Sequence, residues 1–260
     1  MAYDDSLSRR IDPAIAAAFH ADHLDRYRFA AAHADGLRVL DVGCATGYGS
    51  AILAEHASHV TGIDVFADGL SYARARFGRP NVEFRQHDIA SDELLGTDGF
   101  DVIACFEVIE HVEHPVELLK GIARQLRADG VLYLSTPNGP VVTSPDGVLS
   151  DPTHVREYSA SEIGALLARA GLEEDERFGQ RHAPAAIAAQ NERARAARLD
   201  VLGLRRAIPE RLRGRLSIWW VRRRLGADPS EARSTIDADW RTAPILLFSA
   251  RHAGASSDTG

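Results

Sequence analysis

The chain has 260 residues, of which 45% are hydrophobic and 26% charged, proportions typical of an ordinary globular protein that buries a large core. Its two cysteines, Cys44 and Cys105, argue against a disulfide-stabilised scaffold, and we expect both to be reduced, buried thiols. No run of about 18 apolar residues occurs and the N-terminus is acidic, which predicts a cytoplasmic protein with no stable membrane insertion.

Positive charge is concentrated in one segment of a chain whose formal net charge is −7. Between Gln180 and Gly226 there are twelve arginines and three acidic residues. A basic segment in an otherwise acidic chain is not typical of a general nucleic-acid-binding protein, and we expect no nucleic-acid partner. Trp219 and Trp220 lie in this segment on an apolar stripe at near-helical spacing, which fits packing or a homodimer contact, the roof of an acceptor pocket, or contact with a membrane surface.

Strand and helix patterns alternate along the first half of the chain. Asp12 and Pro13 provide an N-cap and a first-turn proline, so a helix is predicted over 14–33. Each following strand pattern leads into a helical one at βαβ spacing, which predicts a doubly wound, mostly parallel α/β sheet. The predicted strands cover 37–42, 59–64, 82–85, 101–106 and 131–135, and the helices between them cover 48–56, 67–77 and 115–127.

The second half of the chain is less regular. Residues 136–158 are rich in proline and poor in apolar residues, which predicts a long loop. A capping box at Ser159 and Glu162 then begins a helix, and strands at 171–178 and 244–250 bring the expected sheet to seven. The predicted organisation is an N-terminal helical segment (1–34), an α/β core (35–180), a basic helical insertion (181–241), a final core strand (242–252) and a disordered tail (253–260).

The most informative stretch is the turn after the first strand, which reads R-V-L-D-V-G-C-A-T-G-Y-G-S over 38–50. Its three glycines let a ligand lie against the backbone where a buried strand feeds a helix. The dinucleotide pattern G-x-G-x-x-G does not fit, because Ala45 and Tyr48 occupy two of the glycine positions. The turn instead resembles motif I of the class I S-adenosylmethionine-dependent methyltransferases, in Asp41, Gly43, Ala45 and Gly47; a structural glycine turn in another α/β protein is the alternative.

Further acidic residues follow the next two strands in the same order. Asp64 ends the second strand, where a carboxylate can accept both hydroxyls of a ribose. In the methyltransferase family, an Asp at the place of Asp88 accepts from the adenine amino group and the next residue covers the ring. The resemblance thus implies that S-adenosylmethionine is bound by ten residues, namely Tyr27, Asp41, Gly43, Cys44, Gly47, Asp64, Val65, Asp88, Ile89 and Phe106.

The first helix also resembles one that closes over the donor in related bacterial enzymes. The segment H-L-D-R-Y-R-F at 23–29 carries this resemblance. It implies that Tyr27 or Arg28 contacts the donor carboxylate, and a solvated helix face is the alternative.

The fourth strand leads into E-V-I-E-H at 107–111, which resembles motif IV of small-molecule O-methyltransferases. A hydroxyl acceptor needs a base or a metal ion that lowers its pKa, and His111 is the best candidate base, followed by His154 from the long loop. Quinone O-methyltransferases and small-RNA 2′-O-methyltransferases resemble this stretch and place a metal there, although E-V-I-E-H also occurs in members without one. The donor set suited to Mg²⁺ or Mn²⁺ would be Glu107, Glu110, His111 and His154.

The resemblance covers about 37–171 and the last strand, and it implies a Rossmann-like class I methyltransferase. The motifs E-V-I-E-H, T-P-N and H-V-R-E-Y, with the arginine-rich insertion, together resemble bacterial enzymes that methylate sugars or glycans. We therefore expect a saccharide or other small-molecule acceptor. The alternatives are a quinone or phenolic O-methyltransferase, a terminal RNA 2′-O-methyltransferase, and a non-catalytic S-adenosylmethionine-binding subunit.

Overall fold

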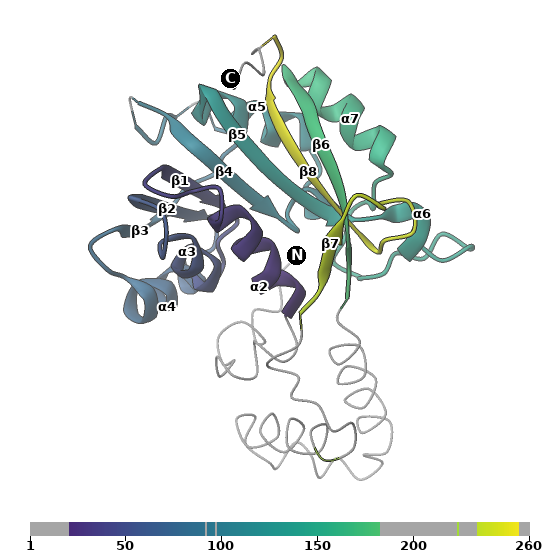
Figure 1. Ribbon diagram of the computed structural model, residues 1–260, viewed down its shortest axis with the longest axis horizontal. Coiled ribbons are helices and arrows are strands. Elements are labelled where there is room, and N and C mark those ends of the chain that lie inside the picture. The colour runs from purple at the N-terminus through teal and green to yellow at the C-terminus, as the bar shows by residue number, and fades with distance from the viewer. Residues whose placement is uncertain (1–20, 92, 97, 183–222, 224–232, 255–260) are drawn as a thin grey trace. The chain divides into compact units, whose positions relative to one another are not determined.

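The computed structural model describes residues 21–91, 93–96, 98–182, 223 and 233–254 (Figure 1). The chain forms two compact units, one made of Met1–Asp25 with Arg181–Thr235, and a larger one made of Arg26–Gln180 with Ile236–Gly260. Little of the smaller unit is described. Within it, Asp25 accepts hydrogen bonds from the backbone N–H and the hydroxyl of Ser234, and His182 is hydrogen-bonded to Asp22.

One twisted sheet organises the larger unit, in the strand order β3-β2-β1-β4-β5-β8-β6-β7. The first five strands in this order are parallel, and β8 runs antiparallel to both β5 and β6. The carboxyl ends of β1 to β5 therefore meet at one edge. The strands are β1 (Arg38–Val42), β2 (His59–Asp64), β3 (Val82–Gln86), β4 (Phe100–Phe106), β5 (Leu126–Pro137), β6 (Leu172–Arg181), β7 (Thr235–Asp237) and β8 (Ile245–His252).

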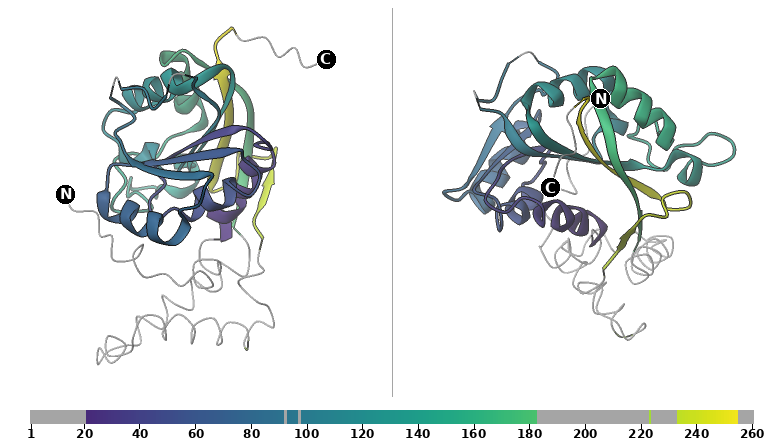
Figure 2. Two further views of the ribbon diagram at one scale, coloured as in Figure 1. Left: turned by 90° about the vertical axis from the view of Figure 1, so that its left-hand side faces the viewer. Right: turned by 45° about the horizontal axis from the view of Figure 1, so that its top comes forward.

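Helices cover both faces of this sheet (Figure 2). Successive strand residues point to opposite faces, so Val39 and Leu40 enter two separate hydrophobic clusters. The Leu40 cluster includes apolar residues of α5 and α7, and the Val39 cluster includes residues of α2, α3 and α4. The helices are α2 (Ala21–Ala31), α3 (Tyr48–Leu53), α4 (Ala67–Phe77), the 3₁₀ turn η2 (Ile109–His111), α5 (Pro115–Gln125), α6 (Gly139–Val142) and α7 (Ala160–Arg169).

The architecture confirms the Rossmann-like α/β prediction and corrects some of its details. The sheet has eight strands instead of seven, because the three residues of β7, inside the predicted insertion, form an additional edge strand. The helix predicted over 115–127 ends at Gln125, since Leu126 already pairs with Phe100 of β4. The predicted loop over 136–158 contains the end of β5 and the short helix α6.

Several predictions concern residues that the structure does not describe. These include the start of the helix at 14, the apolar stripe around Trp219 and Trp220, and the tail beyond 254. Both cysteines are buried and free, as predicted. Among the described residues, no helix is long and apolar enough to cross a membrane.

Candidate active site

The turn after β1 has the strained backbone that its glycines predicted. Gly43 and Gly47 have φ angles of 73° and 84°, and a Cβ on Gly43 would lie 2.5 Å from Cγ2 of Val108. Ala45, which replaces the middle glycine of the motif, adopts φ 47°. Its backbone N–H donates to Oδ2 of Asp64 at 2.9 Å, and this bond fixes the turn against the end of β2. Among residues 43–47, Ala45 alone is exposed, and Gly43 packs closely against Val108, so the glycines allow tight packing of the turn.

Asp41 supports this turn from inside the protein. Its side chain is fully buried and accepts hydrogen bonds from the hydroxyls of Tyr27, at 3.0 Å, and Ser50, at 2.6 Å. Burial raises the pKa of Asp41 to about 6, against the effect of these hydrogen bonds. The ring of Tyr27 in turn packs edge-on against Phe106, with 5.1 Å between centroids. Tyr27, on α2, thus supports the turn by donating a hydrogen bond to Asp41.

The ends of β2 and β3 carry the other two predicted donor-binding carboxylates. Asp64 is half-buried, and its two oxygens accept the N–H groups of Ala45 and Phe66, both at 2.9 Å. Val65 and Phe66 are 50% and 52% exposed, so an apolar surface lies open beside this carboxylate. Asp88 is exposed and accepts from the N–H of Ala90, at 2.9 Å. Because β1, β2 and β3 are adjacent and parallel, Asp41, Asp64 and Asp88 follow one edge of the sheet, the arrangement expected for a nucleoside ligand.

Ile89 and Cys44, both predicted to contact the donor, are almost fully buried, at 5% and 2% exposed. The carbonyl oxygen of Ile89 lies against α5, where a Cβ on Gly121 would be 1.7 Å away. Burial raises the pKa of the Cys44 thiol far above its usual range, so this thiol is not a nucleophile. The backbone of Cys44 is engaged within the turn, since its N–H donates to the Ile63 carbonyl at 3.0 Å and its carbonyl accepts from the Gly47 N–H at 2.8 Å.

Glu107 is the first residue after β4 and has the positive φ of 56° that non-glycine residues seldom adopt. Its Oε1 accepts a hydrogen bond from the Ser135 hydroxyl of β5 at 2.8 Å. The same oxygen lies 3.9 Å from Nη2 of Arg26, on helix α2. Glu107 thus forms an ion pair with a buried arginine that the sequence did not single out.

Glu110 is fully buried in η2 and only half satisfied. Oε2 accepts from the Thr136 hydroxyl at 3.1 Å, whereas Oε1 has no hydrogen-bond partner among the described residues. Burial, and then the charge of Glu107, raise the pKa of Glu110 well above its usual range. The Glu110 carbonyl oxygen accepts the N–H groups of Val155 and Arg156, which holds the loop bearing His154 against η2. An unpartnered buried carboxylate oxygen is costly and indicates a functional site.

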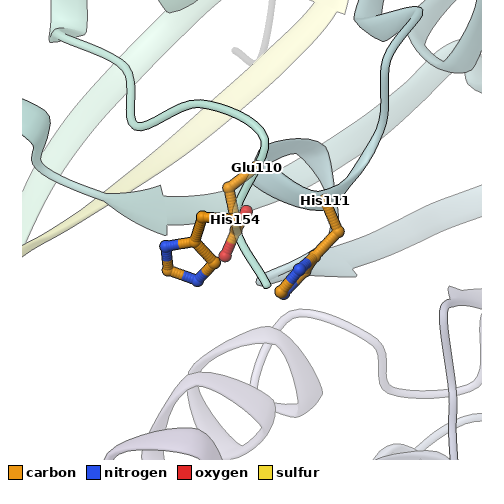
Figure 3. A group of neighbouring side chains, drawn as sticks. All are labelled: Glu110, His111 and His154. Atoms are coloured by element: carbon orange, nitrogen blue, oxygen red, sulfur yellow. The ribbon is translucent and has the colours of Figure 1, made fainter. Parts of the chain in front are cut away.

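Two histidines flank the Glu110 carboxylate (Figure 3). The rings of His111 and His154 are 4.9 Å apart between centroids, and each of the three residues offers one ligand atom within 4.8 Å of the others. Burial lowers the pKa of His111, and the neighbouring His154 lowers it further, so His111 is neutral at physiological pH. Of the four predicted metal ligands, the structure therefore brings together Glu110, His111 and His154, while Glu107 is not part of this group.

Glu157 is a site residue that sequence analysis missed. Its Oε1 lies 2.8 Å from Nδ1 of His154 and accepts the backbone N–H of Ser150 at 2.7 Å, while Oε2 accepts the Thr143 hydroxyl at 2.6 Å. Burial alone would raise the pKa of Glu157, but these hydrogen bonds outweigh it and hold the pKa below its usual range. The ionised carboxylate fixes the proton of His154 on Nδ1 and leaves Nε2 available. The H-x-x-E spacing was the only trace of this pair in the sequence.

Comparison with known proteins identifies the fold that carries this site. A family model described as a methyltransferase domain matches residues 15–176, more than half of the chain. The chain belongs to this methyltransferase-domain family. A probable S-adenosylmethionine-dependent methyltransferase of Mycolicibacterium smegmatis is 34% identical over 147 residues, which cover 56% of each chain. The ubiquinone biosynthesis O-methyltransferase of Xylella fastidiosa is 32% identical over 162 residues, covering 57% of this chain and 66% of the relative.

This methyltransferase domain spans between about half and two thirds of the length of the curated relatives it matches. Among solved structures, the N-methyltransferase NodS of Bradyrhizobium japonicum in complex with S-adenosyl-L-homocysteine has a TM-score of 0.52 at 22% identity, covering 68% of this chain and 84% of that one. The [4+2]-cyclase SpnF has a TM-score of 0.56 at 21% identity, covering 88% and 81%. At such identities the likeness shows the fold alone. Because a cyclase shares this fold, the reaction has to be argued from the site.

Proposed function

We propose that this protein transfers a methyl group from S-adenosylmethionine to a hydroxyl oxygen of a small-molecule acceptor. The observation that carries the proposal is the buried, half-satisfied carboxylate of Glu110 between His111 and His154, on the segment that directly follows the end of β4. Val108, in the same segment, lies against Gly43 of the donor turn. The groups that could activate an acceptor thus belong to a segment in contact with the backbone expected to hold the donor.

The residues around the turn fit S-adenosylmethionine as the methyl donor. When bound, this molecule supplies an electrophilic methyl group on a sulfonium. Ala45, which lies between the two glycines of the turn, is exposed, and the Asp64 carboxylate retains lone pairs for ribose hydroxyls. Asp88 and the exposed side chain of Val65 suit the adenine, through its amino group and its face. This set of contacts supports donor binding along one edge of the sheet.

The chemistry at the acceptor depends on removing a proton from a hydroxyl. His154 is oriented by Glu157, with its Nδ1–H donated to the carboxylate, so that Nε2 can accept a proton. His111 is neutral, and its Nδ1 lies 3.2 Å from the backbone carbonyl oxygen of Thr153. It can therefore also accept the proton of the acceptor hydroxyl. Much of the remaining rate comes from holding the hydroxyl in line with the methyl group.

A divalent ion fits the same group of side chains. Glu110 Oε1 has no hydrogen-bond partner among the described residues, and both histidines offer a nitrogen. The Glu157 carboxylate, in contact with His154, is of the kind that orients an imidazole bound to a metal ion. An Mg²⁺ or Mn²⁺ ion held by Glu110, His111 and His154 would lower the pKa of the acceptor hydroxyl. This oxygen and nitrogen donor set supports the proposal of a metal-assisted reaction.

The acceptor is the least constrained part of the proposal. Relatives named ubiquinone biosynthesis O-methyltransferase favour a phenolic hydroxyl, over the shared part of the chain. A sugar or glycan hydroxyl, expected from the sequence motifs, receives no support from the comparisons and is retained as the second candidate. A phenol has a pKa near 10, whereas a sugar hydroxyl is less acidic, so the second candidate depends more strongly on the base or the metal ion.

A screen with methyl-labelled S-adenosylmethionine tests the proposal. We expect label to pass to the oxygen of a phenol or saccharide from acceptor pools, and not to RNA. The same reaction after exhaustive chelation should lose most of its rate and regain it with Mg²⁺ or Mn²⁺. Full turnover after chelation would contradict the requirement for a metal ion and would assign proton removal to the histidines. Transfer of the label to nitrogen or carbon acceptors alone would contradict O-methylation.

A further inference from the structure

Asp151 begins a tight turn that carries His154 and lies against His111. The turn reads D-P-T-H over 151–154, with an aspartate at its first position and a proline at its second, which are residues that a type I β-turn favours. The backbone carbonyl of Asp151 accepts the N–H of His154 at 3.2 Å and closes the turn. The local sequence thus fixes the backbone that presents one histidine of the candidate site.

The side chain of Asp151 holds the middle of this turn. Its Oδ1 accepts the backbone N–H of Thr153 at 2.8 Å and the Thr153 hydroxyl at 2.6 Å. An aspartate that accepts the N–H group two residues further on is a common support of such turns. A carboxylate also accepts stronger hydrogen bonds than a neutral oxygen does. Asp151 therefore fixes the orientation of Thr153 within an exposed part of the chain.

Thr153 connects the turn to His111 on η2. Its backbone carbonyl oxygen lies 3.2 Å from Nδ1 of His111, and its hydroxyl oxygen lies 3.4 Å from the same nitrogen. A carbonyl oxygen can only accept a hydrogen bond, and the Thr153 hydroxyl donates its proton to Asp151. Nδ1 of His111 is therefore the donor, so that this contact places the ring proton on Nδ1 and the lone pair on Nε2.

Backbone hydrogen bonds attach the chain to η2 on the other side of His154 as well. The carbonyl oxygen of Glu110 accepts the N–H groups of the two residues that follow His154, at 2.8 and 3.2 Å. The two histidines come from different segments of the chain (Figure 3), and their ring centroids are 4.9 Å apart. The way in which the 151–154 turn meets η2 therefore sets the separation of the two rings.

We propose that Asp151 is a positioning residue that fixes the tautomer of His111 and its distance from His154. Its side chain acts on His111 through the Thr153 carbonyl, and its backbone carbonyl acts on His154. Each imidazole then depends on its own carboxylate, His154 on Glu157 directly and His111 on Asp151 through Thr153. The inference rests on the proposed function, since it concerns the same pair of histidines.

Nitrogen-15 NMR of the histidine rings tests the inference on the full chain without any substrate. After exhaustive chelation, His111 of the wild type should be mainly the Nδ1–H tautomer. Asp151→Ala removes the acceptor of both Thr153 hydrogen bonds, and His111 should then become a mixture of the two tautomers. Asp151→Asn keeps an oxygen at the same place and should retain most of the Nδ1–H form. A wild-type tautomer ratio in Asp151→Ala would overturn the inference.

Metal binding and turnover measure the consequence for the site. Asp151→Ala should lower the Mn²⁺ affinity, followed by electron paramagnetic resonance, and kcat by about tenfold each, as for other groups that orient a ligating side chain. The affinity for S-adenosylhomocysteine, measured by calorimetry, should not change. Asp151→Asn should recover most of both losses. An asparagine variant as impaired as the alanine variant would overturn positioning in favour of a direct effect of the charge.

A pair of substitutions at Thr153 isolates the link between the turn and the ring. Thr153→Val removes the hydroxyl that donates to Asp151 and keeps the branched shape of the side chain, whereas Thr153→Ser keeps the hydroxyl. The loss of kcat should be several-fold larger for valine than for serine, and equal losses would overturn the proposed link. Asp146→Ala, at an exposed position of the same loop, is the matched control and should leave kcat and the His111 tautomer unchanged.

Thermal unfolding and donor affinity separate positioning from a loss of structure. Equal losses of S-adenosylhomocysteine affinity and kcat in Asp151→Ala would overturn the inference, because Asp151 would then be structural. A wild-type protein that binds the donor but transfers no methyl group to oxygen acceptors would overturn the proposed function instead. In that case the His111 tautomer in Asp151→Ala still decides the inference, with a mixture supporting it and the wild-type ratio overturning it.

Discussion

His154 Nδ1 and Glu157 Oε1 lie 2.8 Å apart, and the ionised carboxylate fixes which nitrogen of the imidazole carries its proton. Glu157→Gln keeps an acceptor at this place but removes the charge. We expect turnover and metal affinity to fall by about 10- to 100-fold, the usual effect of losing such an outer carboxylate. Nitrogen-15 NMR of the His154 ring should show a smaller fraction of the Nδ1–H tautomer.

Glu162→Gln is the matched control for this variant. Glu162 belongs to the capping box of α7 with Ser159, and a glutamine can complete the same box, so its replacement should lower the free energy of unfolding by only about 0.3–1 kcal/mol, the contribution of a charge near the helix N-terminus. It should leave turnover close to the wild-type value. Equal losses of turnover in the two variants would contradict a specific role for Glu157.

Glu110→Gln separates function from stability at the buried carboxylate. The raised pKa of Glu110 means that burial disfavours its charged form, so a neutral amide of the same shape should preserve the free energy of unfolding. Turnover should fall by about 100-fold, because the unpartnered oxygen is lost as a ligand or hydrogen-bond acceptor. Denaturant unfolding and steady-state kinetics on one preparation check both parts, and a stable variant with full turnover would contradict the site.

Asp41 should make the stability of the protein depend on pH between about 4 and 6. Its folded-state pKa is raised to about 6 from a usual value of 3.8, so the folded protein binds this proton more tightly than the unfolded chain. Its contribution is complete below pH 4 and is lost as pH rises through 6, amounting to about 3 kcal/mol. Urea unfolding across this range should show a falling stability in the wild type and a flatter profile in Asp41→Asn.

Two helical glycines provide a matched pair for packing. A Cβ on Gly121 of α5 would lie 1.7 Å from the Ile89 carbonyl oxygen, whereas a Cβ on Gly164 of α7 would lie 3.8 Å from Oε2 of Glu174. Gly121→Ala should therefore lower the free energy of unfolding by about 3 kcal/mol or more, and Gly164→Ala should raise it by about 0.5–1 kcal/mol. Chemical denaturation measures both, and similar values for the two would contradict the close approach of α5.

The sequence predicted those features that depend on local pattern. The glycine turn and the acidic residues at 41, 64 and 88 were placed correctly, because buried parallel strands have clear apolar runs and carboxylates after them. The edge strand β7 was missed, since three residues with an alternating pattern carry too little periodicity. The prediction of long loop at 136–158 missed α6 for the same reason.

Residues whose contacts join distant parts of the chain could not be predicted from the sequence. Arg26 and Glu107 meet across 81 positions of the chain only because α2 lies over the end of β4. The sequence pointed to Tyr27 or Arg28 and not to Arg26, because periodicity alone does not decide which of two arginines two positions apart on a helix is buried. Glu157 could be recognised only from the structure, in which its carboxylate contacts Ser150, Thr143 and His154.

Binding of S-adenosylhomocysteine to the wild type and to Asp64→Ala, measured by calorimetry, tests the central claim most directly. Asp64 is a half-buried strand-end carboxylate, fixed by two backbone N–H groups and beside an open apolar surface. We predict that the wild type binds this ligand and that Asp64→Ala weakens binding by about 1–3 kcal/mol, the worth of its ribose hydrogen bonds. Tight binding of NAD with no binding of S-adenosylhomocysteine would contradict the account.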